Sequence, residues 1–256
     1  MMVKKSADKD AALIIFLEDK NREQVQSHFS DALDTSDANA LYRAFVEDTI
    51  YTCLEAGAFE VIISYPEGNI KKVVDEAINT LKRVLRGKKR ARLDKTDGWL
   101  WEQGQADTSR DMAVAIDRCF DLGYERVILI DCVTPSISKI MLQNANTVLK
   151  KKDIVFGPTL EGSFYLLGMS SPTPQLFKKI DWSDKERIYP KMVEVACVDK
   201  LNWEELELWY NLCQPGDLEF LARDINAFRI VGDERSAMHT EKVLEELIRK
   251  FQSEET

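Results

Sequence analysis

Asp131 is the first residue whose type and position could support chemistry. It directly follows the apolar run VILI (127–130), and the loop-forming residues Thr134 and Pro135 come soon after it. A carboxylate at the end of a buried strand can ligate a metal ion or bind a substrate. The simpler interpretation is that Asp131 caps the following turn by accepting hydrogen bonds from backbone amides. Both interpretations place Asp131 at the end of a strand.

Glu161 is a second candidate, and it lies in the segment GPTLEGSFYLLGM (157–169). Small residues on both sides of Glu161 would let a bulky ligand approach the backbone beside a carboxylate. The alternative is a hairpin in which these residues serve only the geometry of the turn. Under the first interpretation the candidate ligand-binding residues are Gly157, Pro158, Gly162 and Ser163.

The elements that must position these acids follow an alternating pattern. Strands are predicted at 12–16, 59–65, 99–103, 126–130, 153–158 and 163–169, and helices at 38–55, 70–85, 109–122 and 138–151. This alternation is typical of an α/β protein with a mostly parallel, twisted sheet and helices on both faces.

After residue 169 the alternation stops and helices dominate. Ser183 and Glu186 have capping-box spacing and predict a helix that extends to the mid-190s, and two more helices are expected at 217–227 and 235–251. The basic run at 82–92 is interpreted as a solvated helix end followed by an exposed loop, with anion binding as the alternative. We expect residues 1–256 to form one domain, frayed over about ten N-terminal and about five C-terminal residues.

Composition excludes several classes of function. The 256 residues are 45% hydrophobic and 31% charged, with a formal net charge of −9. An acidic surface disfavours nucleic acid and anionic membranes, because phosphate groups require Lys or Arg. The sequence has no apolar run of membrane length. Five widely spaced cysteines indicate reduced thiols in a cytoplasmic protein, and two histidines argue against a histidine-based metal centre.

The common nucleotide and hydrolase motifs are missing from the sequence. It contains no GxGxxG, GxxxxGK[ST], GxSxG or HExxH. A Rossmann dinucleotide site, a P-loop, a nucleophile elbow and a zinc-protease helix are therefore excluded.

The motifs that remain resemble those of a bacterial glycosyltransferase-A (GT-A) fold family of nucleotide-diphospho-sugar transferases. The stretch VILIDCVTPSIS, followed by LKKKDIVFGPTLEGSFYLLGM, is similar to the family pattern VxLIGxDxPxL…L…xDVVxGPAxDGGYYLLGL without a gap. The similarity extends to LIIFLEDKNREQVQSHF, WEQGQADTSRDMAVAI and LWYNLCQPGDLEFL, so it covers most of the chain.

The resemblance implies a GT-A fold and transfer from a nucleotide sugar to an acceptor, whose identity the sequence does not reveal. It implies a divalent cation, Mg²⁺ or Mn²⁺, in an active protein and none in an inactive one. Glu161 is the expected catalytic residue, and Asp131 is a displaced metal ligand. Asp107 and Asp217 are the remaining substrate-binding candidates, although each also suits the first turn of a helix.

The chain departs from the family pattern where the family carries charge. The family's basic positions hold acidic or neutral residues in this chain: Glu18, Gln26, His28 and Asp111. The family's acidic positions hold the neutral residues Val133, Asn211 and Cys213 and the longer acid Glu161. Asp131 lies two residues before Val133, a displacement of roughly 6–7 Å along a strand, which a fixed metal site cannot tolerate without rearrangement.

The sequence is therefore consistent with two alternative functions. The first is a nucleotide-diphospho-sugar transferase with several metal-binding and phosphate-binding positions substituted. The second is a catalytically silent relative that acts as a binding or regulatory module. A nucleotidyltransferase is disfavoured, because residues 17–29 lack the glycine of a phosphate-binding loop.

Overall fold

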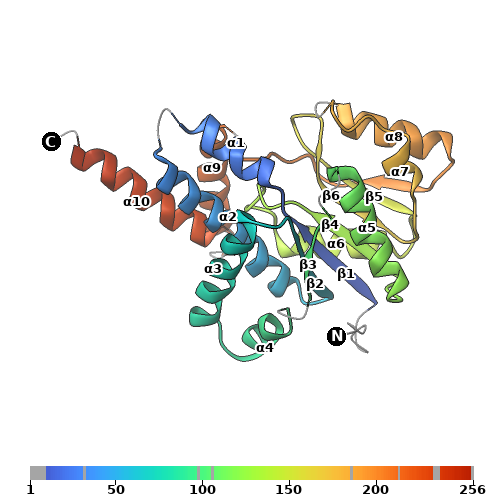
Figure 1. Cartoon of the computed structure of the whole chain (residues 1–256), viewed down its shortest axis with the longest axis horizontal. Helices are drawn as coiled ribbons and strands as arrows, with labels where there is room; N and C mark the ends of the chain where they lie inside the picture. Colours follow the sequence, from blue (N-terminus) through green and yellow to red (C-terminus); the bar gives the residue numbers. More distant parts are fainter. Residues whose placement is uncertain are drawn as a thin grey trace.

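The computed structural model describes residues 10–30, 33–96, 99–104, 107–184, 187–212, 214–232 and 237–254. Within these ranges seven strands form one sheet in the order β3-β2-β1-β4-β6-β5-β7 (Figure 1). The strands are β1 (Ala11–Phe16), β2 (Phe59–Tyr65), β3 (Leu100–Glu102), β4 (Arg126–Ile130), β5 (Ile154–Pro158), β6 (Phe164–Met169) and β7 (Trp203–Glu205).

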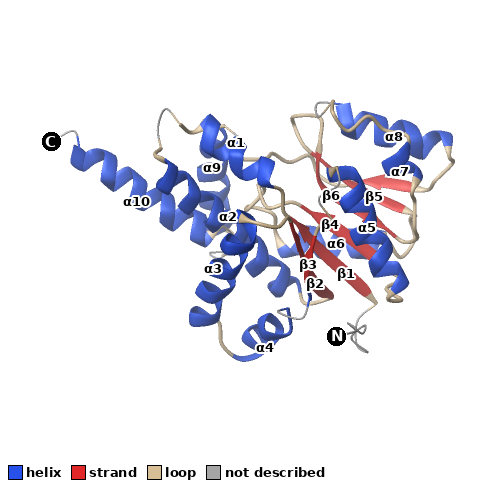
Figure 2. Cartoon of the chain, viewed as in Figure 1, coloured by secondary structure: helices blue, strands red, loops and turns tan. Residues whose placement is uncertain are grey.

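Helices cover both faces of this sheet (Figure 2). They are α1 (Asp19–His28), α2 (Thr35–Ala56), α3 (Asn69–Val84), α4 (Gly87–Thr96), α5 (Thr108–Asp121), α6 (Lys139–Val148), α7 (Gln175–Lys178), α8 (Ile188–Val198), α9 (Asp217–Ile230) and α10 (Met238–Glu254). The predicted α/β class with a mostly parallel sheet is confirmed.

The sheet separates two hydrophobic cores, and β1 shows how. Every residue of β1 is buried. Leu13 and Ile15 pack with α2, α3 and α6, whereas Ile14 and Phe16 pack with α5, α7 and α8. Side chains alternate between the faces of a strand, so a continuous apolar run supplies both cores at once. This explains why the run at 11–16 is apolar throughout.

β6 is the exception to parallel pairing. It runs antiparallel to both β4 and β5, and it lies between them. Its pairing with β5 shifts register between Gly157 and Pro158, which pair with Leu166 and Phe164. Tyr165 is therefore the extra residue of a β-bulge.

The long helices predicted from apolar spacing are confirmed, with ends shifted by a few residues. Asp34 caps α2, because its side chain accepts a hydrogen bond from the Asp37 amide at 2.9 Å. α2 stops at Gly57, whose φ of 78° favours glycine. Ser138 caps α6 by accepting from the Met141 amide.

Two expectations about local structure were wrong. Residues 87–96 form helix α4 instead of an exposed loop, because Leu93 is fully buried and Arg92 donates a hydrogen bond to the Phe59 carbonyl at 3.2 Å. α8 begins at Ile188, later than Ser183. Ser183 bonds to Asp181 instead, through its amide at 3.0 Å and its hydroxyl at 2.6 Å, and Glu186 lies outside the described residues.

Candidate functional site

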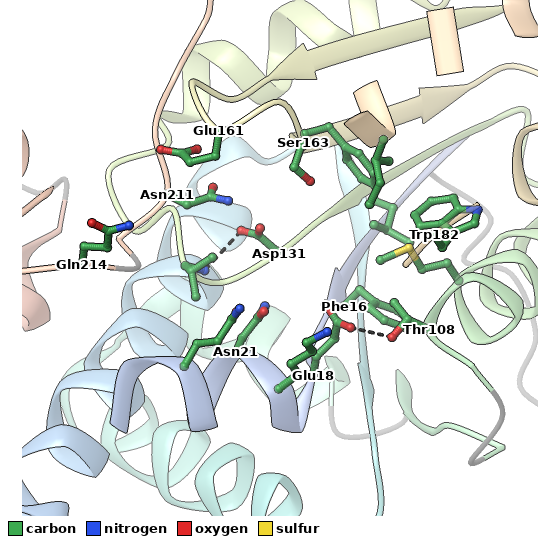
Figure 3. Close-up of a pocket in the computed structure, with 17 residues that line it drawn as sticks. Phe16, Glu18, Asn21, Thr108, Asp131, Glu161, Ser163, Trp182, Asn211 and Gln214 are labelled. Carbon is green, nitrogen blue, oxygen red and sulfur yellow. Dashed lines mark hydrogen bonds between the residues drawn. The ribbon is translucent and has the colours of Figure 1, made fainter. Parts of the chain in front are cut away.

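A cavity of about 360 Å³ lies at the carboxyl ends of β1 and β4. Its walls come from α1, the start of α5, the turn between β5 and β6, and the loops before α8 and α9. Figure 3 shows Glu161, Asn211 and Gln214 toward one end and Phe16, Thr108 and Trp182 toward the other, with Asp131 and Ser163 between them. In an open α/β sheet this edge is the usual place for a ligand.

Strand register brings Asp131 and Glu161 to the same cavity. Ile130, the last residue of β4, pairs with Leu166 of antiparallel β6. The turn that precedes β6 therefore lies beside the carboxyl end of β4, and Glu161 is in that turn. The sequence interpretation requires these two acids to lie on one side of the molecule, and they line one cavity.

Asp131 holds the turn that follows β4. Its Oδ1 accepts a hydrogen bond from the Val133 amide at 3.2 Å and lies 3.1 Å from the Thr134 hydroxyl. The same hydroxyl lies 2.9 Å from Oδ1 of buried Asn211, and its single proton can serve one of the two acceptors. Asp131 thus both caps a turn and faces the cavity.

Val133 occupies the position where the family resemblance predicts an acid. β4 ends at Ile130, so the strand does not continue to Val133. Val133 is 1% exposed and lines the cavity, and its carbonyl accepts a hydrogen bond from the Leu212 amide at 2.7 Å. This bond places Asn211, the neighbour of Leu212, next to the turn after β4.

The segment around Glu161 divides into packing residues and cavity residues. A Cβ on Gly157 would lie 2.4 Å from the Tyr165 ring, so that ring fills the space beside the glycine. Pro158 is buried in β5, and neither of these two residues lines the cavity. Gly162, with φ of 80°, forms the turn that presents Glu161 and Ser163 to the cavity.

Asp107 and Asp217 lie at helix starts, just outside the cavity lining. Asp107 caps α5 by accepting from the Arg110 amide at 3.0 Å. The Ser109 hydroxyl and this amide lower the pKa of Asp107. Asp217 accepts from the Gln214 amide at 2.7 Å. Their neighbours Thr108 and Gln214 are the residues that line the cavity.

Helix α1 supplies residues that sequence reasoning missed. Asn21 is only 6% exposed and lines the cavity, and its side chain points from α1 toward Asp131 (Figure 3). Within the part of the chain that the structure describes, its amide group has no hydrogen-bond partner. The available signal was the spacing of Asn21 and Val25, the buried residues of an otherwise polar segment.

The substituted basic positions serve the packing of α1 and α5. Gln26 donates to Oδ1 of Asn39 at 2.8 Å, and Asp111 accepts from the Gly104 amide at 3.2 Å. Glu18 accepts from the Thr108 hydroxyl at 2.6 Å and lines the cavity. His28 is exposed in the last turn of α1. Cys213 lies outside the described residues.

The charge of the cavity lining is unsuited to an anion. Among the described residues that line it are three carboxylates, Glu18, Asp131 and Glu161, and one lysine, Lys20, which is exposed at the surface. The apolar end is aromatic. Trp182 stacks on Phe177 with ring centroids 5.6 Å apart and meets Phe164 edge to face at 6.1 Å.

The residues present do not fit a divalent cation. Among the described residues, no group of three or more His, Cys, Asp or Glu side chains could hold a metal ion. Mg²⁺ and Mn²⁺ require several oxygen ligands close together. Val133 offers none, and the acids that line the cavity do not form such a group.

Over the described residues, no helix combines the length and apolar character needed to cross a membrane.

Proteins of known structure share this fold, and a family model matches part of the chain. A model of a bacterial family described as "Uncharacterized protein conserved in bacteria (DUF2064)" matches residues 70–184. A crystal structure of a "putative nucleotide-diphospho-sugar transferase" from Desulfovibrio desulfuricans G20 is similar with a TM-score of 0.71 and 23% identity, covering 93% of this chain and 98% of that one. A search of curated proteins found no match.

Two nucleotide-handling enzymes share the fold more distantly. A cytidylyltransferase from Leptospira borgpetersenii serovar Hardjo-bovis (strain JB197) has a TM-score of 0.52 and 13% identity, covering 93% of this chain and 94% of that one. A CMP:2-keto-3-deoxy-manno-octonic acid synthetase in complex with CTP has a TM-score of 0.51 and 9% identity, covering 86% and 99%. The resemblance indicated by the motifs, and the GT-A-like fold it implies, are confirmed.

Proposed function

We propose that this chain is a sugar-binding protein with the nucleotide-diphospho-sugar transferase fold, and that its cavity holds a hydroxyl-rich glycosyl unit. The observation that carries this proposal is the convergence of Asp131, Glu161 and Asn211 on one cavity from three distant segments. Carboxylates and amides bind hydroxyl groups, and aromatic side chains cover the apolar face of a sugar ring.

The charge of the cavity separates this proposal from metal-dependent transfer. Two unit charges 4 Å apart interact by about 1 kcal/mol in bulk water and by about 4 kcal/mol near a protein surface. Glu18, Asp131 and Glu161 would therefore repel a diphosphate, and among the described lining residues Lys20 is outnumbered by these three carboxylates. A binding module, one of the two functions inferred from the sequence, suits this arrangement.

Transfer from a nucleotide sugar is the second candidate, and one observation favours it. Glu161 is exposed in a turn that borders the same cavity as Asp131, where it could accept a proton from an acceptor hydroxyl. In that case Asp131, Ser163 and Asn211 would orient the sugar.

Thermal unfolding in the presence of ligands tests both functions. Methyl glycosides at about ten times their Kd should stabilise the native state by about 1.4 kcal/mol, or roughly 3–6 °C in Tm. UDP, GDP and dTDP without a sugar should leave Tm unchanged. No response to any glycoside would reject sugar binding. A larger response to UDP-, GDP- or dTDP-sugars with Mn²⁺, together with release of the nucleotide that Glu161→Gln abolishes, would instead establish the transferase.

A further inference from the structure

The cavity is lined by an amide, that of Asn21, which makes no hydrogen bond to the described residues. Asn21 is 6% exposed, and its side chain is directed into the cavity without a hydrogen bond to any described residue. An amide that faces a cavity and has no partner among the described side chains is available to hydrogen-bond a ligand there. An amide can accept one hydrogen bond and donate two, so Asn21 suits a ligand that carries both donors and acceptors.

The surrounding charges specify the ligand further. Three carboxylates approach the cavity from three different elements: Glu18 precedes α1, Asp131 follows β4, and Glu161 lies in the turn before β6. Carboxylates accept hydrogen bonds and cannot donate them when ionised. A cation with several N–H donors would be attracted to them, and an anion would be repelled.

The aromatic end of the cavity suits the same ligand. Phe16, Phe164 and Trp182 line it, and Trp182 is held in place by stacking on Phe177. Aromatic faces attract ammonium groups and also pack against the C–H face of a sugar ring. The cavity therefore combines three features that together select an amine on a hydroxyl-rich ring.

We infer that the ligand of this cavity is an amino sugar, bound as its ammonium form by Glu161 and Asp131 with Asn21 completing its hydrogen bonds. This inference rests on the proposed function, because it names the class of glycosyl unit. No covalent step is involved. Replacing the ammonium by a hydroxyl or an acetamido group removes the charge and keeps the ring.

Isothermal titration calorimetry with four probes tests the inference on the full chain. Methyl glucosaminide is the amine, methyl glucoside and methyl N-acetylglucosaminide are its neutral counterparts, and cyclohexylamine carries the charge without the hydroxyl groups. The amine should bind about tenfold more tightly than either neutral glycoside, because its ammonium group adds an attraction to the carboxylates that a neutral group lacks. Its affinity should fall as pH rises through the pKa of the ligand amine.

Three variants locate the binding. Glu161→Gln and Asp131→Asn should each lower the amine affinity about fivefold to tenfold and lower the glucoside affinity by less, because the hydroxyl groups lose one hydrogen-bond acceptor whereas the ammonium loses an opposite charge. The matched control is Glu23→Gln, which removes the same charge from an exposed position on α1 that does not line the cavity. Asn21→Leu should weaken both glycosides, because it removes a hydrogen-bonding group common to both.

The outcomes separate the inference from the proposed function. Equal or tighter binding of methyl glucoside would overturn the amino-sugar inference and leave sugar binding intact. One contrary result is that cyclohexylamine binds as tightly as methyl glucosaminide, and another is that Glu23→Gln lowers the amine affinity as much as Glu161→Gln does. Either result would mean that an acidic protein attracts any amine, and it would overturn the amino-sugar inference. Absence of binding by all three glycosides would remove both conclusions.

Discussion

Asp48 and Glu161 show two opposite uses of an acid in one chain. Asp48 is 1% exposed and accepts four hydrogen bonds from the start of α10: from the amides of His239 and Thr240, the His239 ring and the Thr240 hydroxyl. Glu161 is exposed at the cavity, and its carboxylate makes no hydrogen bond or ion pair with the described residues. A satisfied buried acid serves the fold, and an open acid in a cavity is available to a ligand.

Asp48→Ala gives the largest effect expected from this comparison. It would leave the start of α10 without its acceptor, and we expect a loss of about 3–5 kcal/mol in the free energy of unfolding. Glu161→Gln should change the same quantity by less than about 0.5 kcal/mol. Urea unfolding measures both, and a comparable loss in the two variants would erase the distinction.

Val133→Asp tests the missing carboxylate. Val133 is buried beside Asp131, so a second acid should lower stability by about 3 kcal/mol. Two neighbouring carboxylates can ligate Mn²⁺, and added Mn²⁺ should recover part of that loss. Tm with Mn²⁺ and with a chelator is the measurement. Identical values would mean that the chain lacks more than this one ligand.

Gly157→Ala tests whether a motif glycine serves packing. Its new methyl group would lie 2.4 Å from the Tyr165 ring, and we expect a loss of about 1–3 kcal/mol. Gly216→Ala is the control, because nothing lies within 4 Å of a Cβ there. Sugar binding should survive in Gly157→Ala at temperatures below its Tm. If Gly157→Ala left the stability unchanged, β5 or the Tyr165 ring would have to shift readily to make room for the methyl group, which would contradict the packing role of the glycine.

The contact between Asp48 and His239 predicts a small pH dependence. Burial lowers the pKa of His239, but the hydrogen bond and charge of Asp48 outweigh burial, so the pKa is raised. A raised folded-state pKa stabilises the protein fully below the ordinary pKa of 6.5, and this contribution is lost as pH rises through the higher value. The free energy of unfolding should fall over that interval in the wild type and less in His239→Gln. Equal slopes would contradict the assignment.

The fold was predictable where apolar periodicity carried the information. The runs at 11–16, 59–65 and 126–130 are buried strands, and the spacing of 38–55 gave helix α2. Helix α1 was not predicted, because Val25 is its only buried apolar residue. Helix α4 was not predicted, because a single fully buried apolar residue, Leu93, anchors a strongly basic segment.

The site was predictable only in part. Motif similarity identified Asp131 and Glu161, and strand register brings both to the cavity. The same motif also predicted Gly157 and Pro158 as ligand-binding residues, although they pack inside the sheet. Asn21 and Trp182 carried no motif, because their importance depends on contacts between segments far apart in the chain.

The one-residue bulge at Tyr165 decides which aromatic ring the cavity receives. Because of it, Tyr165 and Leu166 both face the core that contains α2, while Phe164 turns to the side of Trp182. In a strand with uninterrupted alternation the two rings would exchange sides, and a phenol would stand where the phenyl group now lies. The inserted residue thus gives the core two large side chains in succession, Tyr165 and Leu166, and keeps the apolar ring of Phe164 at the wall of the cavity.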